Sequence, residues 1–248
     1  MECEVLVNHE RRAWTRSFYE GNKRLTDVAV AGVLLVILAP LLALVCVAVR
    51  VTSVGAIFFT QDRVGLRGRN FRIIKFRTMV DNADQMGPSV TSSDDPRITR
   101  LGRLLRATKI DELPQLINVV RGDMSLVGPR PQVPRYVSQF PEYSRAVILS
   151  VRPGITGPTA LVFRHEEEML ENRADREEFY LSVLLPMKCD MDVRYVHSRS
   201  AVIDSKVLIE TGAMVSRGML RRMVGRSCPI SMPVALAELV EDRAVGLG

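Results

Sequence analysis

Two adjacent carboxylates, Asp111 and Glu112, are followed along the chain by an arginine between two prolines, Pro129-Arg130-Pro131. Fixed carboxylates can act as nucleophiles or as metal ligands, and arginine pairs bidentately with phosphate. The two prolines restrict the backbone around Arg130, so that less entropy is lost when its guanidinium binds an anion. Together these residue types are suited to chemistry at a phosphate group.

The local pattern predicts that Asp111 caps a helix running from about Leu113 to a stop near Gly122. An N-cap carboxylate accepts backbone N–H groups, and the positive end of the helix dipole favours its ionised form. Because adjacent residues diverge by about 100° around a helix, we expect the two acids to take different roles rather than share one proton. The alternative is an ordinary capped helix with an acidic first turn.

An uncharged apolar run occupies residues 28–49. As a helix it would be roughly 33 Å long, enough for a bilayer core of about 30 Å. Pro40 lies inside the run and predicts a bend at Ala39-Pro40, because proline removes a helical hydrogen bond. Arginines and lysines flank both ends, so both ends prefer the cytoplasmic side. These observations predict a re-entrant helix in one leaflet, with a kinked spanning helix as the alternative.

Beyond the apolar run, the pattern predicts a helix-rich α+β domain. Two strands at 54–61 and 70–79 flank a glycine-bearing turn and form a small β-hairpin that carries Lys75 and Arg77. A basic amphipathic helix follows in residues 96–111, suited either to an anionic membrane surface or to packing on the protein core.

The overall composition indicates anionic partners. The formal net charge is +6, which suits lipid headgroups, phosphorylated substrates or nucleic acid and does not choose among them. The four cysteines are scattered and form no CxxC pair, so the sequence supports neither a zinc site nor a disulfide framework.

Four motifs occur in order: KFRTM at 75–79, DELPQL at 111–116, GDMSLVGPRP at 122–131 and VRPGITG at 151–157. As a set they resemble the bacterial sugar transferase family, the monotopic phosphoglycosyl transferases, from about residue 23 to about residue 211. The chain departs from that family at Ala39-Pro40, where a Ser-Pro pair is usual, and at 158–160, where Pro-Thr-Ala replaces Trp-Ala-Gln.

The resemblance implies a site and a mechanism. Asp111 would be the nucleophile and a ligand of Mg²⁺, and Glu112 would assist with the metal or with a proton. The positions expected to contact substrate phosphate are Arg106, Arg130, Arg152, Lys75 and Arg77.

The resemblance also implies the substrates, a UDP-sugar and undecaprenyl (polyprenyl) phosphate, and the start of exopolysaccharide, capsule or O-antigen assembly. The expected location is the cytoplasmic face of the bacterial inner membrane, in contact with lipid. Nucleic acid is not an expected partner, and the resemblance leaves a homodimer open. The predicted divisions are an extension (1–22), a re-entrant helix (23–51), a catalytic domain (52–211) and a basic helix with a tail (212–248). The alternative function is a noncatalytic adaptor that binds acidic lipid or polyprenyl phosphate.

Overall fold

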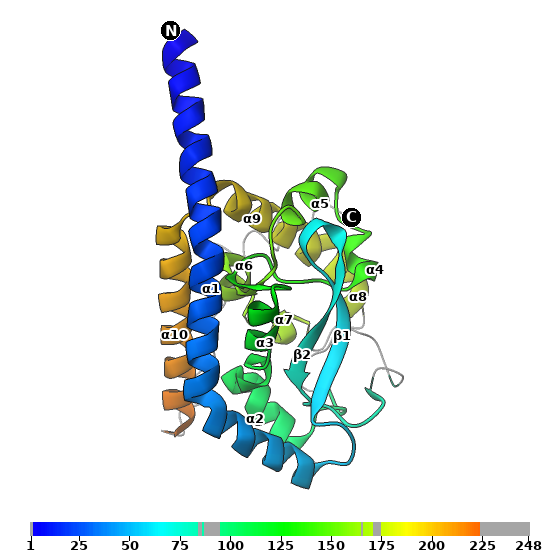
Figure 1. The fold of residues 1–248 in the computed structure, drawn as a ribbon. Coiled ribbons are helices and arrows are strands. Elements are labelled where there is room, and N and C mark those ends of the chain that lie inside the picture. Colours follow the sequence, from blue (N-terminus) through cyan, green and yellow to red (C-terminus); the bar gives the residue numbers. More distant parts are fainter. Residues whose placement is uncertain (1, 84–85, 87–94, 165, 171–174, 224–248) are drawn as a thin grey trace.

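A single long helix, α1 (Glu2–Thr52), runs along one side of the molecule and carries the apolar run (Figure 1). The computed structural model describes all residues except 1, 84–85, 87–94, 165, 171–174 and 224–248. Within these residues, one segment, Tyr19–Thr52, is long and apolar enough to cross a membrane. Residues 2–22 of the predicted extension belong to the same helix. Of the basic helix and tail predicted at 212–248, residues 212–223 are helical and residues 224–248 lie outside the described residues.

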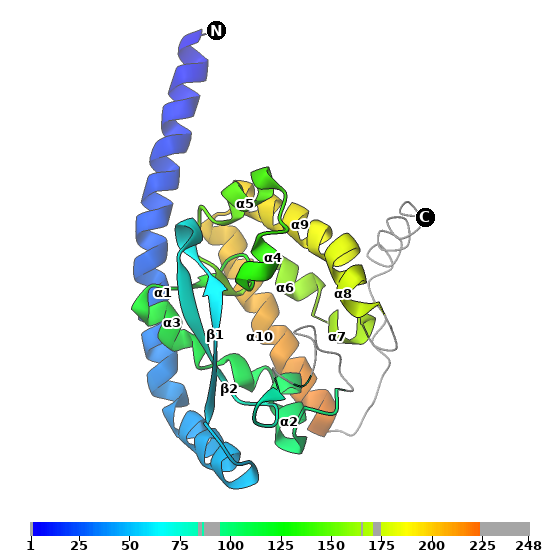
Figure 2. The same cartoon turned by 90° about the vertical axis from the view of Figure 1, so that its right-hand side faces the viewer.

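The lower part of α1 turns away from the axis of its upper part, and Pro40 lies inside the helix (Figures 1 and 2). The two parts pack on different cores. Leu34 and Leu38, before the proline, pack in a cluster with Leu116 and Val119, whereas Val45, after it, packs with Phe76 and Leu105. The segment is thus one continuous bent helix, and its re-entrant path through a membrane stays a prediction.

The domain beside α1 is helix-rich α+β, as predicted. Strands β1 (Phe58–Val64) and β2 (Asn70–Phe76) pair antiparallel, with Gln61 opposite Ile73. The hairpin is confirmed, but its first strand begins four residues later than predicted. Its turn holds Arg67 at φ 56°, next to Gly68 at φ 75°. A second pair, β3 (Ser125–Val127) and β4 (Gly154–Thr156), is parallel and was not predicted.

The remaining elements are helices, most of which lie on one side of α1 together with the hairpin (Figure 2). The basic stretch forms α2 (Arg100–Thr108), capped by Thr99 Oγ1, and α3 (Gln115–Arg121) follows it. The others are α4 (Pro134–Val137), α5 (Glu142–Ile148), α6 (Pro158–Val162), α7 (Glu166–Met169), α8 (Arg176–Phe179), α9 (Leu185–Ser198) and α10 (Ala201–Met223). A π-helical turn at Tyr180–Leu184 joins α8 to α9.

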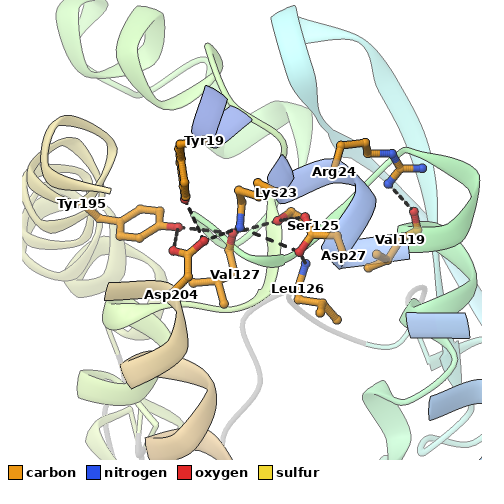
Figure 3. A network of polar contacts seen from close by, with 10 residues as sticks. All are labelled: Tyr19, Lys23, Arg24, Asp27, Val119, Ser125, Leu126, Val127, Tyr195 and Asp204. Atoms are coloured by element: carbon orange, nitrogen blue, oxygen red, sulfur yellow. Dashed lines mark hydrogen bonds and ion pairs between the residues drawn. The ribbon is translucent and has the colours of Figure 1, made fainter. Parts of the chain in front are cut away.

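A polar network fastens α1 to the domain (Figure 3). Asp204 on α10 accepts hydrogen bonds from Tyr19 (2.7 Å) and Lys23 (2.5 Å) of α1, and from Tyr195 of α9 (2.7 Å). Asp27 on α1 accepts from Ser125 Oγ of β3 at 2.6 Å. Both carboxylates are buried, and burial of a carboxylate is tolerated when donors surround it. The network therefore sets where α1 meets α10 and β3.

Candidate active site

The two carboxylates lie in a 3-10 turn, Ile110–Glu112, between α2 and α3. Lys109 ends α2 in the left-handed conformation (φ 58°), and the residue at the N-cap of α3 is Pro114. The prediction that Asp111 caps this helix is therefore wrong, because the helix starts later than the sequence pattern indicated. The predicted end of α3 is confirmed at Gly122, which adopts φ 97°.

Glu112 is held by two cations from other parts of the chain. Lys75 of β2 donates to Oε1 at 3.0 Å, while Arg130 donates from Nη1 to Oε2 at 3.1 Å and from Nη2 to Oε1. Burial alone would raise the pKa of Glu112, but Arg130 and Lys75 hold it well below its usual value. Glu112 is thus an ionised carboxylate inside the protein, and the structure brings three predicted site residues together.

Asp111 is in a different electrostatic environment. It is 6% exposed, and its Oδ1 is buried with no hydrogen-bond partner among the described residues. Burial raises its pKa, and the negative charge of Glu112 raises it further. The pKa of Asp111 is therefore shifted in the direction opposite to that expected from a helix dipole. The pKa values of the two acids are thus shifted in opposite directions, and the division of roles between them stays a prediction.

The unpaired oxygen of Asp111 is relevant to the expected metal. Mg²⁺ prefers carboxylate and phosphate oxygens, and it commonly keeps only one or two protein carboxylates. The described residues contain no group of three His, Cys, Asp or Glu side chains that could hold a metal ion. The donor set therefore fits a cation shared between Asp111 and substrate phosphates better than one held by the protein alone.

The other predicted phosphate contacts are spread more widely. Arg106 Nε donates to Thr78 Oγ1 at 3.0 Å, and its charge opposes the rise in the pKa of Asp111. Arg77 donates to the backbone oxygen of Ser53 at 3.0 Å, near the end of α1. Arg152 donates from Nε to the carbonyl of Gly122 at 2.9 Å, at the end of α3. Phosphate contact by these three arginines stays a prediction.

A cavity of about 320 Å³ lies beside the paired residues and is lined by Glu112 and Arg130. Its wall includes charged residues that the sequence reasoning missed. Lys188 pairs with Glu166 at 2.5 Å and lies over the rings of Phe163 and Tyr180. The available signal was a lysine and an aspartate four residues apart, Lys188 and Asp192, on one face of α9.

Asp192 also lines this cavity, and Thr159 donates a hydrogen bond to its Oδ1 at 2.6 Å. Burial raises the pKa of Asp192 to about 7, and the bond from Thr159 opposes the shift. Thr159 belongs to the segment 158–160, where the sequence departs from the commoner family pattern. The departure therefore lies at the wall of the cavity.

Comparison with known proteins shows which family the chain resembles. A family model described as bacterial sugar transferase matches residues 18–218. UDP-glucose:undecaprenyl-phosphate glucose-1-phosphate transferase of Caulobacter vibrioides is 40% identical over 195 residues, which are 76% of this chain and 67% of the relative. UDP-N-acetylgalactosamine-undecaprenyl-phosphate N-acetylgalactosaminephosphotransferase of Aeromonas hydrophila is 35% identical over 193 residues, 76% of this chain and 42% of the relative.

A shorter relative is covered more fully. Exopolysaccharide production protein ExoY of Sinorhizobium fredii is 32% identical over 214 residues, 79% of this chain and 87% of the relative. The chain spans less than half the length of the Aeromonas relative, so similarity covers only part of that protein. The family match covers the paired carboxylates, the Pro-Arg-Pro segment and the cavity wall together, and the chain therefore belongs to the bacterial sugar transferase family.

Proposed function

We propose that this chain transfers a sugar-1-phosphate from a UDP-sugar to undecaprenyl phosphate and so starts the assembly of an exopolysaccharide or related glycan. The observation that carries the proposal is the buried, unpaired Oδ1 of Asp111 beside an ionised Glu112 that is held by Arg130 and Lys75. One carboxylate thus keeps an oxygen without a hydrogen-bond partner in the described part of the chain, while its neighbour is fixed by two cations. The names of the relatives support the class of substrates.

In the first step, Asp111 Oδ1 forms a bond to the phosphorus that carries the sugar. The anhydride bond of the donor breaks, and UMP leaves with the electron pair. In the second step, a phosphate oxygen of undecaprenyl phosphate attacks the same phosphorus, and the bond to Asp111 breaks to restore the carboxylate. Each step makes and breaks one phosphorus–oxygen bond, so atoms and charge balance.

The neighbouring residues supply orientation and charge. Arg130 and Lys75 already face Glu112 and can share their donors with an incoming phosphate, because arginine and lysine each carry several N–H groups. Mg²⁺, held by Asp111 and donor phosphate oxygens, would compensate the negative charges that otherwise keep a carboxylate and a diphosphate apart. Ionised Asp111 is required for attack, and a cation beside it would favour the ionised form against the burial that raises its pKa.

The packing of α1 supports a location at one face of the membrane. The domain packs along the helix from Ala31 to Val49. A fully spanning α1 would carry β2, α2 and α3 into hydrocarbon, where their charged side chains and irregular turns are costly. We therefore propose that α1 enters one leaflet from the cytoplasmic side of the inner membrane. The apolar residues left exposed on it include Val30, Val33, Val36, Ile37, Leu44, Val47 and Val51.

The reaction is tested by UMP release from protein held in nanodiscs with Mg²⁺, undecaprenyl phosphate and a panel of UDP-sugars. We expect release with at least one sugar and none from Asp111→Asn. Release that survives Asp111→Asn would refute the nucleophile assignment. If folded, lipid-binding protein releases no UMP with any sugar and Asp111→Asn binds lipid equally well, the adaptor function is supported instead.

A further inference from the structure

The cavity beside the site is lined by charged and by apolar residues. Glu112, Arg130 and Lys109 provide charged groups on one wall, from the turn before α3 and from the Pro-Arg-Pro segment. Glu166, Lys188 and Asp192 form a second charged part of the lining. The apolar wall comes mostly from α1, α3, β3 and α10. Its apolar residues include Leu34, Leu116, Leu126, Leu208, Met214 and Val215. Such a division suits a ligand with one anionic group and a hydrocarbon part.

The apolar wall lies where α1 and α10 diverge. The two helices are joined at one end, where Tyr19 and Lys23 donate to Asp204 (Figure 3). From there α10 runs away from α1 toward α2, which it contacts (Figure 2). Leu34 of α1 and Val215 of α10 line the cavity below this junction. The polar network therefore fixes the separation of the two helices that supply the wall.

Both helices also expose apolar side chains away from the cavity. On α1, Val36 is 77% exposed and Ile37 is 66% exposed; on α10, Ile209 is 71% exposed. Large apolar faces of this kind are suited to contact with lipid. A hydrocarbon chain that starts in the bilayer would thus meet apolar surface on these helices before it reaches the charged wall.

We propose that the wall formed by Leu208, Met214 and Val215 binds the hydrocarbon units next to the phosphate of the acceptor lipid. This inference rests on the proposed function, and it assigns the apolar part of the cavity to the acceptor rather than to the nucleotide of the donor. Arg130 and Lys109 face the lipid phosphate. Burial of the first hydrocarbon units against α10 adds to the affinity of the enzyme for a polyprenyl phosphate, whatever its chain length.

The test substitutes residues of the apolar wall and leaves the charged residues of the cavity unchanged. Val215→Trp is compared with Ile209→Trp, which lies on the same helix but does not line the cavity. Leu208→Gln is a second lining variant; Leu208 is 38% exposed, so this change perturbs packing little. Full-length proteins in nanodiscs are checked by thermal unfolding, and then KM is measured for undecaprenyl phosphate, for a short-chain polyprenyl phosphate and for the UDP-sugar.

We expect Val215→Trp and Leu208→Gln to raise KM for undecaprenyl phosphate about tenfold, the loss that follows when about two methylene groups lose their burial. KM for the short-chain polyprenyl phosphate should rise by a similar factor, because that lipid carries the same first units, while Ile209→Trp behaves as wild type. The donor is assayed separately, by exchange of labelled UMP into UDP-sugar without acceptor lipid, and its KM should not follow the acceptor KM.

An unchanged acceptor KM in both lining variants would overturn the assignment. A rise confined to the donor KM in the exchange assay would overturn it too, and would identify the cavity as a nucleotide site. Failure of the proposed function looks different, because wild-type protein would then show neither exchange nor transfer. In that case, saturable binding of undecaprenyl phosphate that Val215→Trp weakens and Ile209→Trp does not would still support the lipid wall, and equal binding by both would refute it.

Discussion

Arg130 binds Glu112 through both terminal nitrogens of its guanidinium, with Nη1 3.1 Å from Oε2 and Nη2 on Oε1. Lys75 donates to that same Oε1 at 3.0 Å. The three side chains come from a strand, a turn and a proline-flanked segment. In the proposed reaction, a substrate phosphate would therefore share Arg130 and Lys75 with the carboxylate of Glu112.

Replacing Arg130 by lysine keeps the charge but removes the planar pair of donors. We expect Arg130→Lys to lower kcat/KM for sugar transfer by about 100-fold, because a lysine cannot pair bidentately with carboxylate or phosphate. Steady-state kinetics of UMP release measure this. Arg135→Lys is the matched control, since Arg135 pairs with Glu177 at the surface and should keep wild-type activity. Equal kinetics for the two variants would contradict an orienting role for Arg130.

The buried carboxyl of Asp192 predicts a dependence of stability on pH. Burial raises its pKa to about 7, so the folded protein keeps a proton that the unfolded chain releases at lower pH. Wild-type stability should therefore fall as pH rises from about 4 to about 7 and stay reduced above that. Asp192→Asn should remove this part of the loss, and the gain at pH 8 should be on the order of 2–4 kcal/mol.

Thermal unfolding of both proteins between pH 5 and pH 8 checks this prediction. The melting temperature of Asp192→Asn should exceed that of wild type by more at the higher pH. Asp190→Asn, an exposed position on the same helix, serves as the control. If the melting temperatures of Asp192→Asn and wild type differ by the same amount at every pH in this range, Asp192 does not titrate as described.

The network around Asp204 predicts a large loss of stability when its carboxylate is removed. Asp204→Ala leaves Tyr19, Lys23 and Tyr195 without their shared acceptor. We expect the free energy of unfolding to fall by about 3–5 kcal/mol, because three hydrogen bonds to a buried carboxylate are lost and, among the described residues, Lys23 keeps only Asp27 as a partner, at 3.8 Å. Denaturant unfolding in detergent measures this, and Asp62→Ala is the control: Asp62 is 64% exposed and pairs with Arg72 only at 3.7 Å. A loss similar to the control would mean that apolar packing alone holds α1.

The close approach of α2 to the segment after β2 makes Gly102 sensitive to any side chain. A Cβ there would lie 1.9 Å from the carbonyl oxygen of Thr78, whose hydroxyl accepts from Arg106. Gly102→Ala should destabilise the protein by about 2–4 kcal/mol, since backbone must move. Gly212→Ala on α10 meets nothing within 4 Å and should be neutral or stabilising by up to about 1 kcal/mol. The melting temperature of Gly102→Ala should therefore fall below that of Gly212→Ala. Equal values would contradict the close approach of Gly102 to the carbonyl oxygen of Thr78.

Local patterns in the sequence predicted several elements because their causes are local. The hairpin followed from alternating residues around a glycine turn, and α3 ends at Gly122 because glycine accepts φ 97° without strain. The start of α3 was predicted wrongly. Lys109 in the left-handed conformation and a 3-10 turn come before Pro114, and no residue type in that stretch predicts either feature.

The sequence by itself determined the family, the adjacent carboxylates and the proline inside the apolar helix, since these depend on residue order alone. Tertiary structure decided which cations reach Glu112, and it placed Arg77 and Arg152 on backbone carbonyls at the ends of other helices. It also decided that Asp111 is buried and unpaired, which reverses the pKa direction expected from a helix cap. The reason is physical: burial and the charge of distant residues set a pKa and a cavity wall, and neither can be known until the chain brings those residues together.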